Sequence, residues 1–338
     1  MEAMRVLFIG GTGLISSACA SLASARGHAL TLLNRGKTAK LPVPPGVELL
    51  RADVRDRKAV EAALGGRTFD AVVNWIAFTP EHVEQDVAVF GGRCGQYVFI
   101  SSASAYEKPP ARYLITEETP LVNPYWEYSR QKIACEERLR RAFAASRFPA
   151  TIVRPSLTYG PTQIPLALSC WNAPYTLIRR ARAGRPLIVP GDGTYIWVLT
   201  HHRDFELGLV GLLGNPAAAG EAFHITSDEA LDWNRLYGAF FAACGAAPNL
   251  CHVPSDLLIR LDPSHQGSLL GDKAQSTVFD NAKFKRFVPG FRCAVPFADG
   301  IRETVAWFDA DPARQTVDPA TEAFWDRCVS AIEKASTA

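Results

Sequence analysis

The sequence lacks several features that would mark a specialised class of protein. It contains no run close to the about 18–20 consecutive apolar residues of a membrane helix, and no charged-then-apolar leader precedes its first apolar segment. Internal repeats and low-complexity segments are also missing. We therefore expect a soluble protein of the cytoplasm with no membrane partner.

Paired or clustered metal-binding residues are scarce as well. The eight cysteines form no CxxC pair and no zinc-like group with histidine. Most of them lie in apolar or helical surroundings, as in Ala18-Cys19-Ala20, where a free thiol behaves as a small hydrophobe. His201 and His202 with Asp204 invite a metal interpretation, but no further ligand group lies close in sequence. We expect reduced thiols and no bound metal.

The chain also lacks a strong charge of either sign. Its 36 lysines and arginines nearly balance 34 acidic residues, which leaves a net charge of +2. A net charge this small does not indicate nucleic acid or an anionic membrane as a binding partner. Local basic clusters, such as 179–182 and 283–286, are typical of solvated helix faces, unless one of them meets substrate phosphates. With 338 residues, 48% of them hydrophobic, the chain can bury the core of two domains or of one domain with a lobe.

A strand that breaks at glycines stands near the N-terminus. The apolar segment 5–9 runs into Gly10-Gly11-Thr12-Gly13-Leu14-Ile15-Ser16, a strand–turn–helix junction typical of a nucleotide-binding βαβ unit. Gly10 suits a tight turn, and Gly13 has no Cβ to keep a pyrophosphate away. A helix that begins near Leu14 directs free N–H groups at that phosphate.

Strand-like and helix-like segments alternate through the first half of the chain. We predict strands at 5–9, 29–33, 47–51, 70–74, 97–100 and 150–153, and helices at 17–26, 56–64, 80–93 and 126–146. Near-continuous apolar strands separated by helices indicate a parallel sheet covered on both faces. The predicted fold is therefore α/β, a Rossmann-type doubly wound parallel sheet with a smaller C-terminal substrate lobe. We place the dinucleotide-binding domain at 1–160, with returning segments near 195–226, and the lobe mainly at 161–338.

A tyrosine and a lysine share one face of the predicted helix 126–146. Tyr128 and Lys132 are four residues apart. With an ordinary pKa of about 10, a tyrosine is a poor base at neutral pH, but a nearby lysine and an oxidised nicotinamide would move that pKa toward the working range. Ser102 follows the fifth strand, at the sheet edge where ligands bind. The pair alone is more typical of a surface contact, whereas Ser102 and the glycine turn, taken with the pair, favour catalysis.

These segments together resemble the extended short-chain dehydrogenase/reductase superfamily, often labelled NAD-dependent epimerase/dehydratase. The resemblance implies that Ser102, Tyr128 and Lys132 form a catalytic triad. It also implies a homodimer in which helices 80–93 and 126–146 form a four-helix bundle. The cofactor-binding residues expected from the turn and the resemblance are Gly10, Gly11, Thr12, Gly13, Leu14, Ile15, Asp53, Val54, Ala77, Ser101 and Pro155.

Three departures from the family pattern bear on structure and substrate. Ser16 stands where a third glycine is usual, but it is small enough to keep the helix close to the strand. Ala103 and Ser104 follow Ser102 where sugar 4,6-dehydratases carry acids that eliminate water, so dehydration is not expected. Trp197 stands near the usual position of a diphosphate-binding arginine, which weakens the case for a nucleotide sugar.

A fourth departure concerns the cofactor. Asn34-Arg35 ends the second strand, where NAD-preferring members carry an acidic residue for the ribose 2′-hydroxyl. Arg35, with Lys37, would pair with a 2′-phosphate instead. We therefore expect NADP, with NAD as the alternative because Asn34 could hydrogen-bond a plain ribose.

The leading hypothesis is an NAD(P)-dependent oxidoreductase of the epimerase/dehydratase type, acting on a secondary alcohol or ketone of a small molecule, with a sugar-nucleotide epimerase as the most typical outcome. An NADPH-dependent ketone reductase would use the same residues. The chloroplast stem-loop-binding proteins, relatives with an arginine inside the same motif as Arg130 here, make RNA binding an alternative, although the charge argues against it. A cofactor-sensing regulator without turnover is the last possibility. For the wall of the substrate pocket we predict Ser104, Gln163, Trp171, Asn172, Tyr195 and Trp197.

Overall fold

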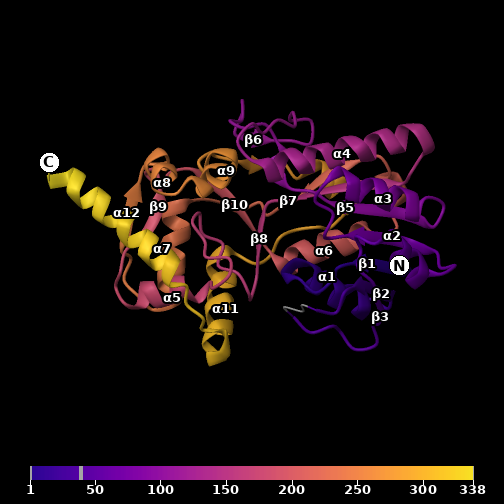
Figure 1. Cartoon of the computed structure of the whole chain (residues 1–338), viewed down its shortest axis with the longest axis horizontal. Helices are drawn as coiled ribbons and strands as arrows, with labels where there is room; N and C mark the ends of the chain where they lie inside the picture. The colour runs from indigo at the N-terminus through magenta and orange to yellow at the C-terminus, as the bar shows by residue number, and fades with distance from the viewer. Residues whose placement is uncertain (1, 38–40, 338) are drawn as a thin grey trace.

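A parallel sheet forms the N-terminal half of the protein (Figure 1). The computed structural model describes residues 2–37 and 41–337. Within them the main sheet has seven strands in the order β11-β7-β5-β4-β1-β2-β3, and each neighbouring pair is parallel. The strands are β1 (Arg5–Ile9), β2 (Ala29–Asn34), β3 (Glu48–Arg51), β4 (Phe69–Asn74), β5 (Cys94–Ile100), β7 (Ala150–Pro155) and β11 (Ala222–Ile225). This order confirms the predicted doubly wound fold, whose strand order reverses between β1 and β4.

Helices cover both faces of this sheet, as the apolar strands predicted. The helices of this half are α1 (Leu14–Ala25), α2 (Arg57–Leu64), α3 (Pro80–Phe90), α4 (Glu127–Ser146) and α6 (His202–Leu212). In β1, Val6 and Phe8 join the core beneath α1 and α6, whereas Leu7 and Ile9 join the core beneath α2, α3 and α4. Successive residues of a strand point to opposite faces, so a strand that is apolar throughout is buried on both.

The C-terminal lobe is built from short sheets and helices around a core of its own. Its strands are β8 (Leu157–Tyr159), β9 (Leu187–Pro190), β10 (Ile196–His201), β12 (Ala230–Asp232) and β13 (Leu250–Val253), and β14 (Val278–Phe279) pairs with β6 (Leu114–Ile115). Its helices are α5 (Tyr175–Arg182), α7 (Trp233–Cys244), α8 (Ser255–Leu261), α9 (Gln266–Ser268), α11 (Phe297–Asp309) and α12 (Pro319–Thr337). The helix α10 (Ala282–Phe287) packs instead against β11 of the main sheet, where Phe284 joins the core beneath α1 and α6. The two termini lie at opposite ends of the molecule (Figure 1).

The chain crosses between the two halves more than once. After β7, the strands β8 and β10 pair with each other, and β10 also pairs with β12, in a small sheet of the lobe. The chain then returns through α6 and β11, and β11 adds the last strand to the main sheet beside β7. Of the segment predicted to return near 195–226, α6 and β11 therefore belong to the main sheet's layers, and β10 belongs to the lobe.

No helix in the part of the chain that the structure describes is both long and apolar enough to span a bilayer.

Candidate active site

The glycine turn between β1 and α1 has the conformation that its sequence predicts. Gly10 and Gly11 have φ values of +102° and +95°, which side chains rarely allow. A Cβ on Gly11 would also lie 2.7 Å from Leu32 Cδ2. At Gly13 the φ is −86°, and an added Cβ would meet a single atom within 4 Å, Ser16 Oγ at 3.4 Å. The backbone conformation therefore requires glycine at Gly10 and Gly11, whereas the absence of a side chain at Gly13 leaves open space beside the turn.

Ser16 completes the start of α1. Its hydroxyl accepts a hydrogen bond from Gly13 N at 2.9 Å and donates one to Gly13 O at 3.3 Å. The side chain is 4% exposed. A serine here caps the helix, so the missing third glycine does not disturb the turn.

A cavity of about 700 Å³ opens at the carboxyl ends of the central strands. It is lined by most of the residues predicted to bind the cofactor, which are Gly10, Gly11, Thr12, Gly13, Leu14, Ile15, Ser101 and Pro155. Ser102, Tyr128 and Lys132 line the same cavity. The free N–H groups at the start of α1 and the open space at Gly13 fit the pyrophosphate of a dinucleotide.

Lys132 is held rigidly beside Tyr128. Its Nζ donates hydrogen bonds to Ala77 O at 2.7 Å and to Ile100 O at 2.8 Å. The same nitrogen lies 5.8 Å from the centre of the Tyr128 ring. Ala77, predicted to lie along the cofactor, is fully buried and contributes its carbonyl to this clamp.

Burial controls the pKa of the Tyr128 phenol in the chain without its cofactor. Burial raises the pKa of Tyr128 to about 12, and Asp272 adds to this rise, while a hydrogen bond from Ser102 opposes it. Burial also lowers the pKa of Lys132 to about 8. Desolvation of the phenolate therefore dominates the pKa of Tyr128 in the chain without its cofactor, and the lowering that we expect depends on the oxidised nicotinamide as well as on Lys132.

A buried ion pair supports the floor of this cavity. Arg154 donates to both carboxylate oxygens of Glu136, at 2.9 and 2.6 Å, and to Tyr106 Oη at 3.0 Å. Ser101 Oγ donates to the same carboxylate at 2.6 Å. The pair joins α4, which carries Tyr128, to the ends of β5 and β7. Such a bidentate pair fixes geometry more than it adds stability.

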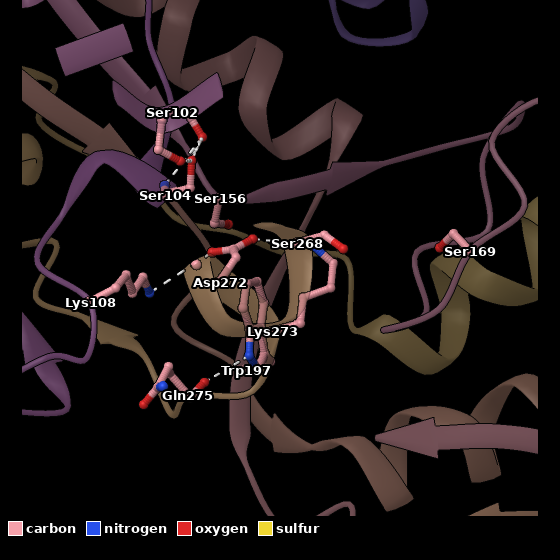
Figure 2. A network of polar contacts seen from close by, with 12 residues as sticks. Ser102, Ser104, Lys108, Ser156, Ser169, Trp197, Ser268, Asp272, Lys273 and Gln275 are labelled. Atoms are coloured by element: carbon pink, nitrogen blue, oxygen red, sulfur yellow. Dashed lines mark hydrogen bonds and ion pairs between the residues drawn. The ribbon is translucent and has the colours of Figure 1, made fainter. Parts of the chain in front are cut away.

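A second cavity, of about 260 Å³, adjoins the first. The two share Ser102, Tyr128, Trp171 and the segment 155–157. The other walls of this second cavity include the rings of Trp126, Trp197 and Phe279 and the charged residues Lys108, Asp272 and Lys273. Trp197 is fixed by a hydrogen bond from its Nε1 to Gln275 O at 2.9 Å (Figure 2). Ser102 and Tyr128 therefore stand between a dinucleotide cavity and a smaller one suited to a substrate.

Part of the predicted substrate wall lies in these cavities. Ser104 and Trp197 line the smaller cavity, Gln163 the larger and Trp171 both. Asn172 and Tyr195 are exposed and lie outside the lining of either cavity. Tyr195 precedes β10 and packs toward the turn at Gly191, where a Cβ would lie 3.6 Å from its ring.

The predicted ribose-binding residues lie at the ends of β2 and β3. Arg35 pairs with Asp53 at 3.8 Å, and both side chains are exposed. Asn34 Oδ1 accepts a hydrogen bond from Gly36 N at 2.9 Å. Val54 is buried, and its carbonyl accepts a hydrogen bond from Gln85 Nε2 at 2.6 Å.

Sequence reasoning missed the charged residues of the smaller cavity. Lys108 follows Ser102 closely, and Trp126 precedes Tyr128, so nearness to a predicted catalytic residue was an available signal for these two. Asp272 and Lys273 carry no such signal, because only the docking of the lobe brings them to Tyr128.

His201 and His202, at the junction of β10 and α6, are surrounded as residues with a structural role would be. The Asp204 carboxylate accepts hydrogen bonds from Ala294 N at 2.9 Å and Val295 N at 3.1 Å. Burial lowers the pKa of His201 to about 3 and that of His202 to about 4. Among the described residues, no group of three or more His, Cys, Asp and Glu side chains is arranged to hold a metal ion.

Comparison with known proteins gives a family match and relatives of several activities. The family model for the NAD dependent epimerase/dehydratase family matches residues 6–226. The 2′-dehydrokanamycin reductase of Streptomyces kanamyceticus is 28% identical over 86% of this chain and 81% of its own. The chloroplast stem-loop binding protein of 41 kDa b from Arabidopsis thaliana is 27% identical over 73% of this chain and 65% of its own.

A solved structure extends the likeness to the whole fold. The dTDP-glucose 4,6-dehydratase of Bacillus anthracis, in complex with NAD, has a TM-score of 0.74 and 19% identity, over 92% of this chain and 98% of that chain.

Proposed function

The chain belongs to the NAD dependent epimerase/dehydratase family, and we propose that it transfers hydride at a secondary alcohol or ketone carbon held against Ser102 and Tyr128. It is an enzyme of the short-chain dehydrogenase/reductase type, an NAD(P)-dependent oxidoreductase. The observation that carries the proposal is that Ser102 and Tyr128 line both cavities. Epimerisation of a sugar nucleotide is the leading outcome.

Three side chains divide the work at the substrate oxygen. Tyr128 takes the proton of a substrate hydroxyl on oxidation and returns it on reduction. Ser102 donates a hydrogen bond to the same oxygen and so fixes its position. Lys132, clamped by two carbonyls, keeps a positive charge near the phenol. When bound, an oxidised nicotinamide ring would accept the hydride, and its charge would favour the phenolate that burial disfavours.

The site does not support loss of water. Ala103 and Ser104 occupy the position of the dehydratase acids, and Ser104 Oγ lies 2.9 Å from Ser102 Oγ and accepts from Ser129 at 2.7 Å. Asp272 is the carboxylate in the smaller cavity, and it is ion-paired with two lysines. Elimination needs a separate acid and base, and these residues leave Tyr128 as the proton carrier.

The cations at the ends of β2 and β3 support NADP(H) as the form of the nicotinamide cofactor. Asn34 and Arg51 are register partners in the sheet, and the Arg51 guanidinium packs on Gly36, where a Cβ would lie 2.5 Å from it. Arg35 stands beside them. Two exposed guanidinium groups at this point suit a 2′-phosphate, which forms strong charge-assisted hydrogen bonds with arginine.

This preference makes ketone reduction by NADPH the second candidate. A reductase would use the same proton carrier, with Tyr128 as the acid. The 2′-dehydrokanamycin reductase relative lends further support. RNA binding has less support, because Arg130, the residue shared with the stem-loop-binding proteins, is already engaged within the chain. It pairs with Glu127 at 2.7 Å and donates to Pro124 O at 2.8 Å.

The decisive experiment separates an epimerase from a reductase on purified full-length protein. We expect a nicotinamide dinucleotide to bind, measured by calorimetry with NADP⁺ and NAD⁺. An epimerase interconverts UDP-sugars with no net change in nucleotide absorbance at 340 nm, whereas a reductase oxidises NADPH in proportion to ketone added. Folded protein that binds neither dinucleotide would contradict the proposal.

We also propose a homodimer formed through α3 and α4. These helices lie side by side at one edge of the molecule (Figure 1), and Arg138 of α4 pairs with Glu84 of α3 at 3.0 Å. Sedimentation equilibrium tests this, and a monomer at micromolar concentration would contradict it.

A further inference from the structure

Two buried lysines share one aspartate in the smaller cavity. Lys108 Nζ lies 3.9 Å from Asp272 Oδ1, and Lys273 Nζ lies 3.1 Å from Asp272 Oδ2. The side chains of the two lysines are 1% and 7% exposed, and that of the aspartate is 13% exposed. Figure 2 shows Lys108 and Lys273 reaching Asp272 from different sides. We call these three residues the lysine cluster.

The lysine cluster carries one positive charge in excess. Among the described residues that line this cavity, its three members are the charged ones, and two ammonium groups face one carboxylate. Burying an uncompensated charge is costly in a protein interior. Lys273 lies 5.2 Å from the centre of the Trp197 ring and 6.0 Å from that of Trp126, which offsets part of this cost.

Lys108 has the less complete set of partners. Its ammonium carries three donors, yet within the described chain it makes no hydrogen bond, and its distance to Asp272 exceeds hydrogen-bond length. Burial lowers the pKa of Lys108, while Asp272 opposes that change. An anion that reached this ammonium would satisfy its donors and restore the charge balance of the cavity.

The lysine cluster lies close to the reacting centre. The charge of Asp272 acts on the pKa of Tyr128, and Ser102 and Tyr128 line the same cavity as the lysines. A group bound at the lysine cluster is therefore part of the same small molecule that presents its oxygen to Tyr128. The aromatic walls suit the apolar face of a sugar ring or of another carbon skeleton.

We infer that Lys108 and Lys273, bridged by Asp272, bind an oxyanion substituent of the substrate, a carboxylate or a phosphate. This rests on the proposed function and names the substrate class of that site. A neutral substrate would leave the excess charge buried. An amino sugar would bring a further cation toward two lysines whose carboxylate is already paired, and like charges repel at this distance.

The test uses the full chain loaded with NADP⁺ and four matched probes, which are glucuronate, glucose 1-phosphate, glucose and glucosamine. Trp126, Trp171 and Trp197 line the cavity, so tryptophan fluorescence and calorimetry both report binding. At low salt we expect at least one of the two anions to bind about tenfold more tightly than glucose, with glucosamine weakest, as for a charge-assisted contact. Preference for glucuronate assigns a carboxylate, and preference for glucose 1-phosphate assigns a phosphate. Equal binding of all four, or tightest binding of glucosamine, overturns the inference.

Variants protect this test against a simple folding defect. Lys108→Met and Lys273→Met should each weaken the preferred anion about tenfold and leave glucose unchanged. Asp272→Asn should strengthen anion binding, because it removes the competing carboxylate, and a misfolded variant would not do so. Lys283→Met is the matched control, since Lys283 pairs with Glu221 at 2.7 Å outside this cavity.

Failure of this inference is distinguishable from failure of the proposed function. Protein that binds NADP⁺ but treats the anions and glucose alike in every variant contradicts the lysine cluster alone. Protein that binds neither NADP⁺ nor NAD⁺ contradicts the proposed function, and its anion preference is still measurable by fluorescence.

Discussion

The two adjoining cavities are assembled in different ways. The larger one is lined mainly by short consecutive runs at strand ends, which are 10–16 after β1, 100–102 from the last residue of β5 and 155–158 from the last residue of β7. The smaller one shares the segment 155–157 with it and adds residues from distant segments, such as Lys108, Trp197 and Asp272. A parallel sheet delivers the residues after its strands to one edge by topology alone, whereas the smaller cavity exists only after the lobe has docked.

The cavities also differ in how they hold buried charge. In the larger one, Lys132 is fixed by two backbone carbonyls, so its position follows from the main sheet. In the smaller one, two lysines share one carboxylate. The first arrangement fixes a cation beside the Tyr128 ring, and in the second two ammonium groups face a single carboxylate.

The sharpest test of this contrast is Tyr128→Phe, which removes the proton carrier where the cavities meet. We expect turnover to fall by about 10²- to 10⁴-fold, the usual contribution of a general acid or base. The affinity for NADP⁺ should stay within about twofold, since the ring is retained. Tyr125→Phe, at a tyrosine outside both linings, is the matched control. A Tyr128→Phe enzyme with near-normal turnover would falsify the assignment.

Arg35→Ala tests whether the larger cavity continues to a 2′-phosphate. The dissociation constant for NADP⁺ should rise about tenfold to a hundredfold, because a charge-assisted contact is lost. Binding of NAD⁺ should barely change. Arg57→Ala removes another exposed arginine, one that pairs with Glu61 at 2.8 Å, and should affect neither nucleotide. Equal losses for NADP⁺ and NAD⁺ would rule out the 2′-phosphate contact.

Gly13→Ala tests whether Gly13 leaves room for a ligand, in contrast to Gly11 of the same turn, whose backbone conformation requires glycine. We expect affinity for either dinucleotide to fall about tenfold, because the new Cβ enters the cavity, while stability changes by less than about 1 kcal/mol. Gly11→Ala is the counterpart: with its φ of +95° and a Cβ 2.7 Å from Leu32, it should lose about 1–3 kcal/mol of stability. Urea unfolding and calorimetry on both variants check this, and a Gly13→Ala protein with normal binding would refute the open-space role.

Asp86→Asn tests a buried charge that serves the fold of the main sheet. Burial raises the pKa of Asp86 to about 6, above its ordinary value of 3.8, despite hydrogen bonds from Asn74 and Tyr97. The native state therefore holds its proton more tightly than the unfolded chain, and stability declines as pH rises from about 4 to 6.

The free energy of unfolding of the variant, relative to that of the wild type, should therefore increase by about 1 kcal/mol from pH 5 to pH 8, as measured by urea unfolding. Asp70→Asn is the control, because Arg5 holds the pKa of Asp70 below its ordinary range. Its loss of stability should be the same at both pH values. A pH-independent difference for Asp86→Asn would contradict the raised pKa.

The sequence predicted the larger cavity better than the smaller one. The apolar run at 5–9, the glycine turn and the spacing of Tyr128 and Lys132 are local patterns, and the structure brings them together as expected. The spacing of Tyr128 and Lys132 did not reveal how strongly burial raises the pKa of Tyr128 in the chain alone, because spacing along a helix says nothing about desolvation. Asn172 and Tyr195 were expected in the pocket but are exposed, since nothing in their neighbourhood specifies which way the irregular lobe faces.

The sequence by itself determined the doubly wound sheet, the glycine turn and the helix that carries Tyr128 and Lys132, because each rests on neighbours in the chain and on a periodicity of two or about 3.6 residues. Only the tertiary structure decided the substrate side. Lys108 and Asp272 meet through packing between a loop of the main sheet and the π-helical segment Leu269–Lys273 of the lobe. No local propensity encodes such a contact, because its energy comes from burying groups that are far apart in the chain.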